Sequence, residues 1–292
     1  MERMAFQLPG GFVDDEGLVH DRVILAPLCG FAEKMVAGRN GKPAPVLVTA
    51  LLSRSIEKIG GIEQVSEGLV RRLLAGDRLF LLLKLREMTF GRRIEAVIRC
   101  SFPDCGARAD IDFATDNIPV SRSPQQARWH KLQLSPQAGG LLVTFRLPNG
   151  EDQEELSNLL DSDEELAADN LLARCLQSIG AVRGPSLAEV AGLPAAAKAE
   201  IENEMERLAP KIGASLAALC PECGRSFTAA FDVQEFVLTE LHTRLDLLLK
   251  EVHYLAYHYH WSEKEILGMT RENRRRYIEV LSGEMERLHH AF

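Results

Sequence analysis

The chain has 292 residues, of which 46% are hydrophobic and 26% charged, and its formal net charge at pH 7 is −8. This composition is that of an ordinary globular protein, and the length allows one large or two modest domains. The negative net charge argues against a protein that binds nucleic acid nonspecifically. The amino terminus lacks the apolar core of a signal peptide, and no apolar stretch approaches the length of a membrane span. We therefore expect a soluble, reduced, cytoplasmic protein.

Residues 1–45 are rich in glycine and proline, with a short strand-like run at residues 23–25, so they predict an amino-terminal arm. Residues 46–150 then predict several helices followed by strands. One of these helices is indicated by apolar residues at spacings of three and four, and Asp77 is the predicted N-cap of the next. The apolar residues of that first series are Ile62, Val65, Leu69 and Leu73.

Residues 151–210 are acidic at first and later rich in alanine and glutamate, which favours helix. Ser186 and Glu189 have the spacing of a capping box within this segment. We predict a separable acidic helical insert here, bounded by turns at residues 148–150 and 210–213. Residues 211–235 carry a second pair of cysteines and a strand pattern. Residues 236–292 predict a carboxy-terminal helical module, with a long leucine seam followed by two shorter helices.

Two cysteine hairpins dominate the pattern. Cys100 and Cys105 precede Gly106, while Cys220 and Cys223 precede Gly224. Alternating apolar residues flank both pairs and predict half-buried strands. Two such hairpins facing each other form a zinc ribbon, in which four thiolates surround one structural Zn2+. Because four thiolates leave no open coordination position, this site is predicted to be structural.

Other interpretations of these cysteines remain open at this stage. Four reduced thiols could simply fill a core, or each pair could form a disulfide if the chain were exported. Cys29 and Cys175 stand apart from the two pairs, and Cys175 is predicted to be a small core residue on a helix.

No enzyme signature accompanies the hairpins, since the sequence lacks a phosphate-binding loop, a nucleophile elbow and a zinc-protease helix. We therefore expect a protein without catalytic activity. The aromatic and histidine residues between His253 and Trp261 are poorly spaced for shared metal binding. They predict either a docking surface or a seam covered by the two following helices.

Several motifs resemble those of baseplate hub assembly chaperones, proteins of T-even-like contractile phage tails and of related extracellular contractile injection systems. The motifs are residues 8–12, 76–86 and 89–91 together with the cysteine hairpin that follows. Residues 254–261 and 274–277 resemble a small helical module encoded in the same injection-system clusters. The resemblance covers about the first 120 and the last 60 residues, and the acidic segment resembles nothing we recognise. It implies an assembly or structural role without catalysis, with baseplate, hub or other tail proteins as partners.

Together these patterns predict an α+β, mainly α protein. A discontinuous zinc ribbon with four cysteine ligands joins the helical amino-terminal region, the helical insert and the carboxy-terminal helical module. The runner-up function is a zinc-ribbon adaptor that binds nucleic acid, which would show a steep salt dependence of DNA or RNA binding.

Overall fold

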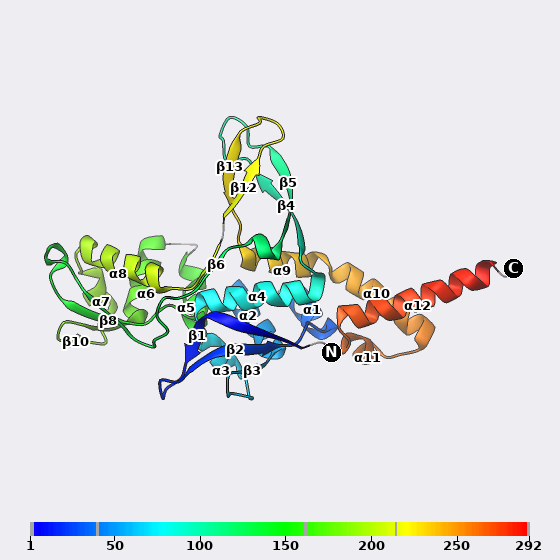
Figure 1. Cartoon of the computed structure of the whole chain (residues 1–292), viewed down its shortest axis with the longest axis horizontal. Helices are drawn as coiled ribbons and strands as arrows, with labels where there is room; N and C mark the ends of the chain where they lie inside the picture. Colours follow the sequence, from blue (N-terminus) through cyan, green and yellow to red (C-terminus); the bar gives the residue numbers. More distant parts are fainter. Residues whose placement is uncertain (1–2, 39–40, 161–162, 214, 291–292) are drawn as a thin grey trace.

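The structure, a computed structural model, describes residues 3–38, 41–160, 163–213 and 215–290. Three bodies lie in a row and a narrow hairpin tower rises from the middle one (Figure 1). Helices predominate over short antiparallel strands, which confirms the α+β, mainly α class. No helix among the described residues is both long enough and apolar enough to cross a bilayer.

The central body, which we call the first repeat, spans residues 4–90. Its sheet has the order β1-β2-β3, and its helices pack on that sheet around a core that includes Leu8, Val23 and Leu81. Residues 4–37 are therefore an integral layer of this body and not an arm. The elements are β1 (Met4–Val13), β2 (Val19–Leu25), α1 (Gly30–Ala37), α2 (Ala44–Ser55), β3 (Ile56–Ile59), α3 (Glu67–Arg72) and α4 (Ala75–Phe90).

Two local predictions in this body are wrong. The apolar series from Ile62 to Leu73 is not one helix, because only Glu67–Arg72 is helical and Ser66 caps it. Asp77 does not cap a helix either, because α4 begins at Ala75 and the Asp77 side chain is turned into the core. Over so few residues, a short strand or a single capped turn can place apolar residues at the same three- and four-residue spacings as a helix.

The second repeat, at the left in Figure 1, spans residues 130–208 and has its own core around Phe145, Leu172 and Ile201. Its sheet has the order β10-β9-β8-β7. The elements are β7 (His130–Gln133), β8 (Leu142–Phe145), α5 (Gly150–Leu160), α6 (Glu164–Cys175), β9 (Leu176–Ile179), β10 (Val182–Arg183), α7 (Leu187–Ala191) and α8 (Ala195–Leu208).

The predicted insert at residues 151–210 is thus neither purely helical nor correctly bounded. Strand β8 pairs with β9, so residues before 150 belong to the same sheet as residues after it. The chain leaves and returns at β6 (Val120–Ser121) and β11 (Lys211–Ile212), which pair with each other. Gly213 N–H also donates to the carbonyl of Pro119 at 2.6 Å. The inserted unit therefore begins near residue 122.

The two bodies are copies of one plan. Strand β3 pairs with β2 through Val23–Ile59 and Leu25–Ile56, and β9 pairs with β8 through Val143–Ile179 and Phe145–Leu176. Each pair in the second body lies 120 positions after its counterpart, and both ladders have the same register shift. Glycines with φ of +54° follow β3 and β9 at Gly60 and Gly180. An internal duplication accounts for this agreement, since unrelated chains would not share register and irregularity alike.

The tower consists of two hairpins, β4 (Arg93–Arg99) with β5 (Arg108–Ala114) and β12 (Ser215–Leu219) with β13 (Ser226–Ala230). Its strands flank the two cysteine pairs as the alternation predicts. The tower joins the body where α4 leads into β4 and where β13 leads into α9.

The carboxy-terminal module lies at the opposite end of the row from the second repeat (Figure 1). It contains α10 (Leu245–Tyr259), α11 (Glu263–Leu267) and α12 (Arg271–His290), and α9 (Val233–Thr243) connects it to the body. The predicted long leucine seam is divided between α9 and α10 at Arg244. Ser262 caps α11 with a capping box.

Candidate metal centre

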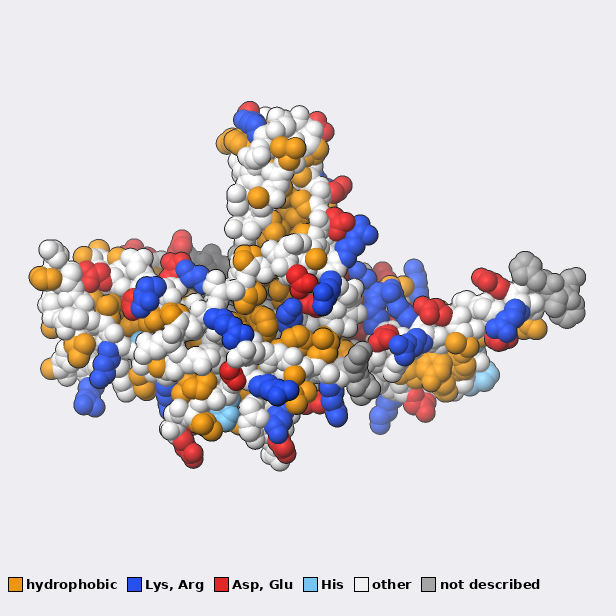
Figure 2. Space-filling view, viewed as in Figure 1, with side chains coloured by type: hydrophobic (Ala, Val, Ile, Leu, Met, Phe, Trp, Pro, Cys, Tyr) orange, Lys and Arg blue, Asp and Glu red, His pale blue; other side chains and the backbone are white. Residues whose placement is uncertain are grey.

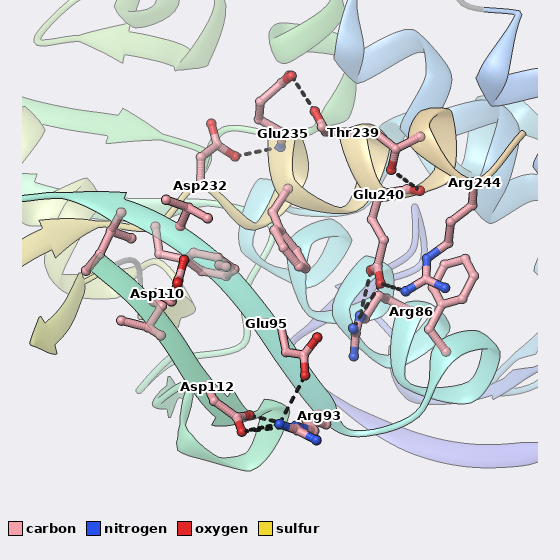
Figure 3. Close-up of a pocket in the computed structure, with 18 of the residues that line it drawn as sticks. Arg86, Arg93, Glu95, Asp110, Asp112, Asp232, Glu235, Thr239, Glu240 and Arg244 are labelled. Carbon is pink, nitrogen blue, oxygen red and sulfur yellow. Dashed lines mark hydrogen bonds and ion pairs between the residues drawn. The ribbon is translucent and has the colours of Figure 1, made fainter. Parts of the chain in front are cut away.

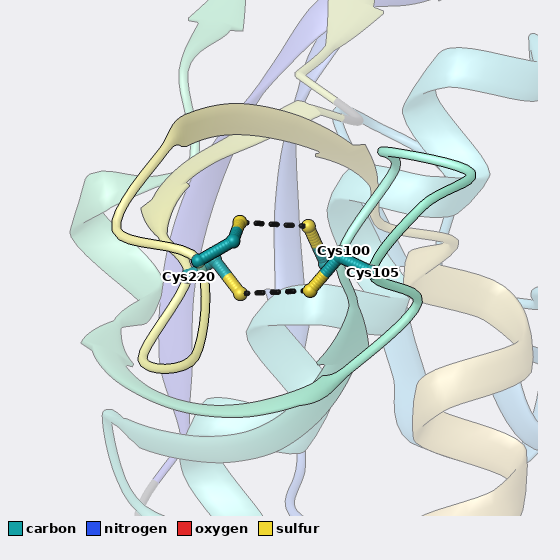
Figure 4. A group of neighbouring side chains, drawn as sticks. Cys100, Cys105 and Cys220 are labelled. Carbon is teal, nitrogen blue, oxygen red and sulfur yellow. Dashed lines mark hydrogen bonds between the residues drawn. The ribbon is translucent and has the colours of Figure 1, made fainter.

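Both cysteine hairpins end in the tight turns that their glycines allow. Cys100 N–H donates to the Ala107 carbonyl at 2.8 Å, and Cys220 N–H donates to the Arg225 carbonyl at 3.0 Å. Gly106 and Gly224 adopt φ of +61° and +67°, a conformation that favours glycine. The turns direct two side chains of each hairpin toward the other hairpin (Figure 4).

The structure brings together all four cysteines predicted to bind metal. The sulfurs of Cys100 and Cys223 are 3.9 Å apart, and those of Cys105 and Cys220 are 3.7 Å apart. All four ligand atoms lie within 4.8 Å of one another, and none of the cysteines is in a disulfide. A tetrahedral ion with metal–sulfur bonds of about 2.3 Å requires sulfur separations of about 3.8 Å. The four thiols could therefore hold a metal ion.

Arg225 supports this cluster from outside. Its guanidinium donates to both carboxylate oxygens of Asp104 at 2.8 Å and to the sulfur of Cys223 at 3.4 Å. The guanidinium also lies 3.9 Å from the ring centre of Phe102, so it stacks on an aromatic ring of the first cysteine hairpin. One side chain thus joins the two hairpins, and sequence analysis missed it. The only feature of the sequence that points to Arg225 is its position two residues after the predicted ligand Cys223.

The thiols of Cys100, Cys105 and Cys223 differ in how readily they ionise. The hydrogen bond from Arg225 lowers the pKa of Cys223 to about 6. A backbone hydrogen bond at Ala107 acts to lower the pKa of Cys105, but desolvation and the neighbouring thiols outweigh it and raise that pKa to about 12. Desolvation also raises the pKa of Cys100. Only a bound cation would offset the repulsion among four thiolates, so this donor set is suited to a divalent metal.

A cleft of about 1080 Å³ lies where the tower meets the body (Figure 3). Several of its charged side chains are paired with one another. Arg86 and Arg244 both donate to Glu240, each at 2.9 Å, and Arg93 lies 2.7 Å from Asp112. The rings of Phe113 and Phe231 meet edge to face at 5.3 Å and anchor the tower to this site. The cleft thus presents satisfied ion pairs at the foot of the tower.

In the carboxy-terminal aromatic cluster, some residues are covered by the following helices and others are exposed, so each of the two predicted interpretations fits part of it. Trp261 stacks on Tyr259 at 4.6 Å and meets Tyr277 of α12 edge to face at 4.8 Å, so the following helices cover it in part. Tyr257 remains 70% exposed. Apolar side chains gather over these helices in Figure 2.

Comparisons with known proteins give two family matches. Residues 46–238 match the model of the family described as T4 bacteriophage base plate protein, and residues 238–292 match a family of unknown function, DUF6760. No curated protein matches the chain. No solved structure matches it either. The first match includes the acidic segment, which our resemblance left out, and omits residues 1–45, which the resemblance included in part. Because it covers well over half of the chain, the protein belongs to the T4 bacteriophage base plate protein family.

Proposed function

We propose that the protein is a non-catalytic structural or assembly factor, of the chaperone type, for the baseplate of a contractile phage tail or injection system. Its partners would be baseplate, hub or other tail proteins of the particle. The observation that carries this proposal is the closed sulfur cluster at the tip of a tower that stands clear of the body (Figure 2). Such a cluster stiffens a projecting element without offering a reactive position.

We assign structural Zn2+ to this cluster, with Cys100, Cys105, Cys220 and Cys223 as its ligands. The support is the sulfur spacing, the tetrahedral donor set and the small apolar core beneath it, which includes Ile98 and Phe227. A core of that size is insufficient to hold two hairpins together, so metal binding would supply the missing folding energy.

Nucleic-acid binding is less well supported. Of the four described cations of the tower, Arg93 pairs with Asp112 and Glu95, and Arg225 pairs with Asp104, which leaves only Arg99 and Arg108 for contacts with phosphates. A sequence-independent interface with phosphates requires unpaired cations along one face.

Co-expression with the tail proteins of the same gene cluster tests the proposal. We expect the full chain to co-purify with a baseplate component, and Leu219→Asp at the exposed tip of the tower to weaken this association. Mass spectrometry of mature particles then separates a resident subunit from an assembly chaperone. Tails that assemble with normal yield and infectivity in the absence of the protein would contradict the proposal.

A further inference from the structure

One kind of helix junction occurs at three sites in the chain, once in each repeat and once in the carboxy-terminal module. In the first repeat it joins α3 to α4 (residues 70–78), in the second it joins α7 to α8 (residues 190–198), and in the carboxy-terminal module it joins α11 to α12 (residues 266–274). We call these junctions sockets A, B and C. Each has a buried aliphatic residue, a second apolar residue three positions later and a base five positions after that. These residues are Val70, Leu73 and Arg78, then Val190, Leu193 and Lys198, and then Ile266, Met269 and Arg274.

In each socket the base pairs with a polar residue of the preceding long helix. Arg78 donates to Thr49 at 2.8 Å, and Arg274 donates to Glu251 at 2.9 Å. The corresponding distance from Lys198 to Asp169 is 2.6 Å. The three sockets are therefore equivalent in construction as well as in sequence position.

Socket A holds the start of α5. Gly150 N–H donates to the Leu73 carbonyl and Ala75 N–H donates to the Pro148 carbonyl, both at 3.1 Å. A Cβ on Gly150 would lie 2.1 Å from Nη1 of Arg78, so only glycine allows this approach. One turn later, the Glu154 carboxylate accepts a hydrogen bond from Arg71 at 2.8 Å.

Socket C holds the start of α1 in the same way. Gly30 N–H donates to the Met269 carbonyl at 3.1 Å, and a Cβ on Gly30 would lie 3.0 Å from Nη1 of Arg274. Glu33, one turn later, accepts a hydrogen bond from Arg274 at 2.7 Å. The two occupied sockets thus hold similar ligands, each with a glycine at the start of a helix and an acid three or four residues after that glycine.

Socket B holds nothing within the described part of the chain. No described residue pairs with the Leu193 carbonyl or the Ala195 N–H, the groups that correspond to those used in socket A. Pro194 occupies the position that Leu74 has in socket A. The missing N–H of proline does not matter there, because the Leu74 N–H makes no hydrogen bond to the start of α5. Pro194 and Ala195 are exposed, and Leu166 and Leu187 of the same repeat are 41% and 37% exposed.

We propose that socket B receives the start of a helix from another tail protein. That helix would follow an extended residue through a glycine and carry an acidic side chain in its first turn, directed at Lys198. That the partner is a tail protein rests on the proposed function. The chemistry expected of the partner's helix is inferred from the ligands of sockets A and C. A second copy of this chain is a poorer occupant, because its own helix starts at Gly30 and Gly150 already lie in sockets C and A.

The test uses the full chain and a fluorescent peptide with the sequence of residues 146–160, which is the ligand of socket A. We expect saturable binding by fluorescence anisotropy, weakened at least about tenfold by Ala195→Arg or Leu193→Asp in the protein, a loss of the size that removing a central contact gives. Valine at the position of Gly150 in the peptide should weaken binding equally. Val280→Asp, at an exposed site on α12, is the matched control and should bind normally.

Absence of binding, or binding indifferent to both socket variants, would overturn the inference. Self-association of the full chain that Ala195→Arg abolishes would assign the socket to a second copy and also overturn it. The proposed function fails separately. If the peptide binds as expected but no tail protein co-purifies with the chain, the socket stands and the baseplate role falls.

Discussion

The backbone N–H of Gly10 donates to Oδ1 of Asp77 at 2.7 Å and so ties β1 to α4 inside the core. Both residues belong to motifs on which the family resemblance depends. A Cβ on Gly10 would lie 2.9 Å from Oδ2 of Asp77, and a Cβ on Gly76 would lie 2.1 Å from the Pro210 carbonyl oxygen. The motifs are therefore the two sides of one close contact. Asp77 is fully buried, and its Oδ2 has no hydrogen-bond partner among the described residues.

Asp77 should make stability depend on pH. Desolvation raises its pKa from 3.8 to about 7, so the folded state binds the proton more tightly than the unfolded state does. The contribution of this group to stability is then fully present below pH 3.8 and is lost as the pH rises through 7. From about pH 5 to pH 8, we expect the free energy of unfolding of the wild type to fall by roughly 2–3 kcal/mol relative to that of Asp77→Asn. Urea unfolding at both pH values measures this, with the exposed Asp110→Asn as the control. Equal pH slopes for wild type and Asp77→Asn would refute it.

Removing one metal ligand should unfold the tower. We expect the wild type to bind one zinc per chain and Cys223→Ser to lose it. The variant should also destabilise both hairpins, because the free energy of metal binding would contribute to their folding. Elemental analysis of freshly purified, reduced protein measures the zinc content. Cys29→Ser changes a cysteine outside the cluster and should retain the metal. Metal-free wild type would contradict the assignment of zinc.

Arg225 should slow the loss of metal. Without Arg225, the second hairpin loses the ion pair with Asp104 that joins it to the first, and the sulfur of Cys223 loses a hydrogen-bond donor. We expect Arg225→Ala to release zinc to a chelator several-fold faster than wild type. Arg225→Lys should be intermediate, because an ammonium cannot reproduce the forked pairing. Arg99→Ala, on the same tower, serves as the control, and equal release rates in all four proteins would exclude this role.

The contact between the two repeats should depend on Gly150. Gly150→Ala places a methyl group against the buried Arg78 guanidinium, which Thr49 and Pro45 hold in place. We expect a loss of about 1–3 kcal/mol in unfolding free energy, the usual effect of overpacking. Gly283→Ala is the matched control, because that helical glycine has open space around it and should become slightly more stable. A neutral Gly150→Ala would mean that the two repeats are joined loosely.

Two aromatic residues of the carboxy-terminal module should behave differently. Trp261→Ala removes a ring stacked between Tyr259 and Tyr277 and should cost about 1–3 kcal/mol, less than a fully buried residue would. Tyr257→Ala removes an exposed ring and should leave the melting temperature within about a degree. Thermal unfolding compares the two. A loss of stability in the second variant equal to that in the first would contradict the observed packing.

The sequence was sufficient to predict the four-cysteine cluster and its flanking strands, because the chemistry is carried by short local patterns. The capping box at Ser186, which the structure confirms, is equally local. The duplication was missed although Leu51, Leu52, Arg54 and Ile59 recur as Leu171, Leu172, Arg174 and Ile179. Most intervening side chains differ, and the agreement between the repeats lies mainly in the pairing of their strands.

The position of the insert could not be predicted for a different reason. The pairing of Ser121 with Lys211 joins residues that are distant in sequence, and the two-residue strands that form it have no periodicity to detect. The same holds for β8 and β9, which are four residues each and lie on either side of two helices.

Cys105 and Cys220 are separated by 115 positions, and the whole second repeat is translated between them. At roughly 5–20 residues per second, the first hairpin leaves the ribosome about 6 to 23 seconds before its partner exists. During that interval it offers only two thiols to any passing ion, which cannot complete a tetrahedron. Stable capture of a metal ion by all four thiols would therefore require a nascent chain in which the second repeat has already been synthesised.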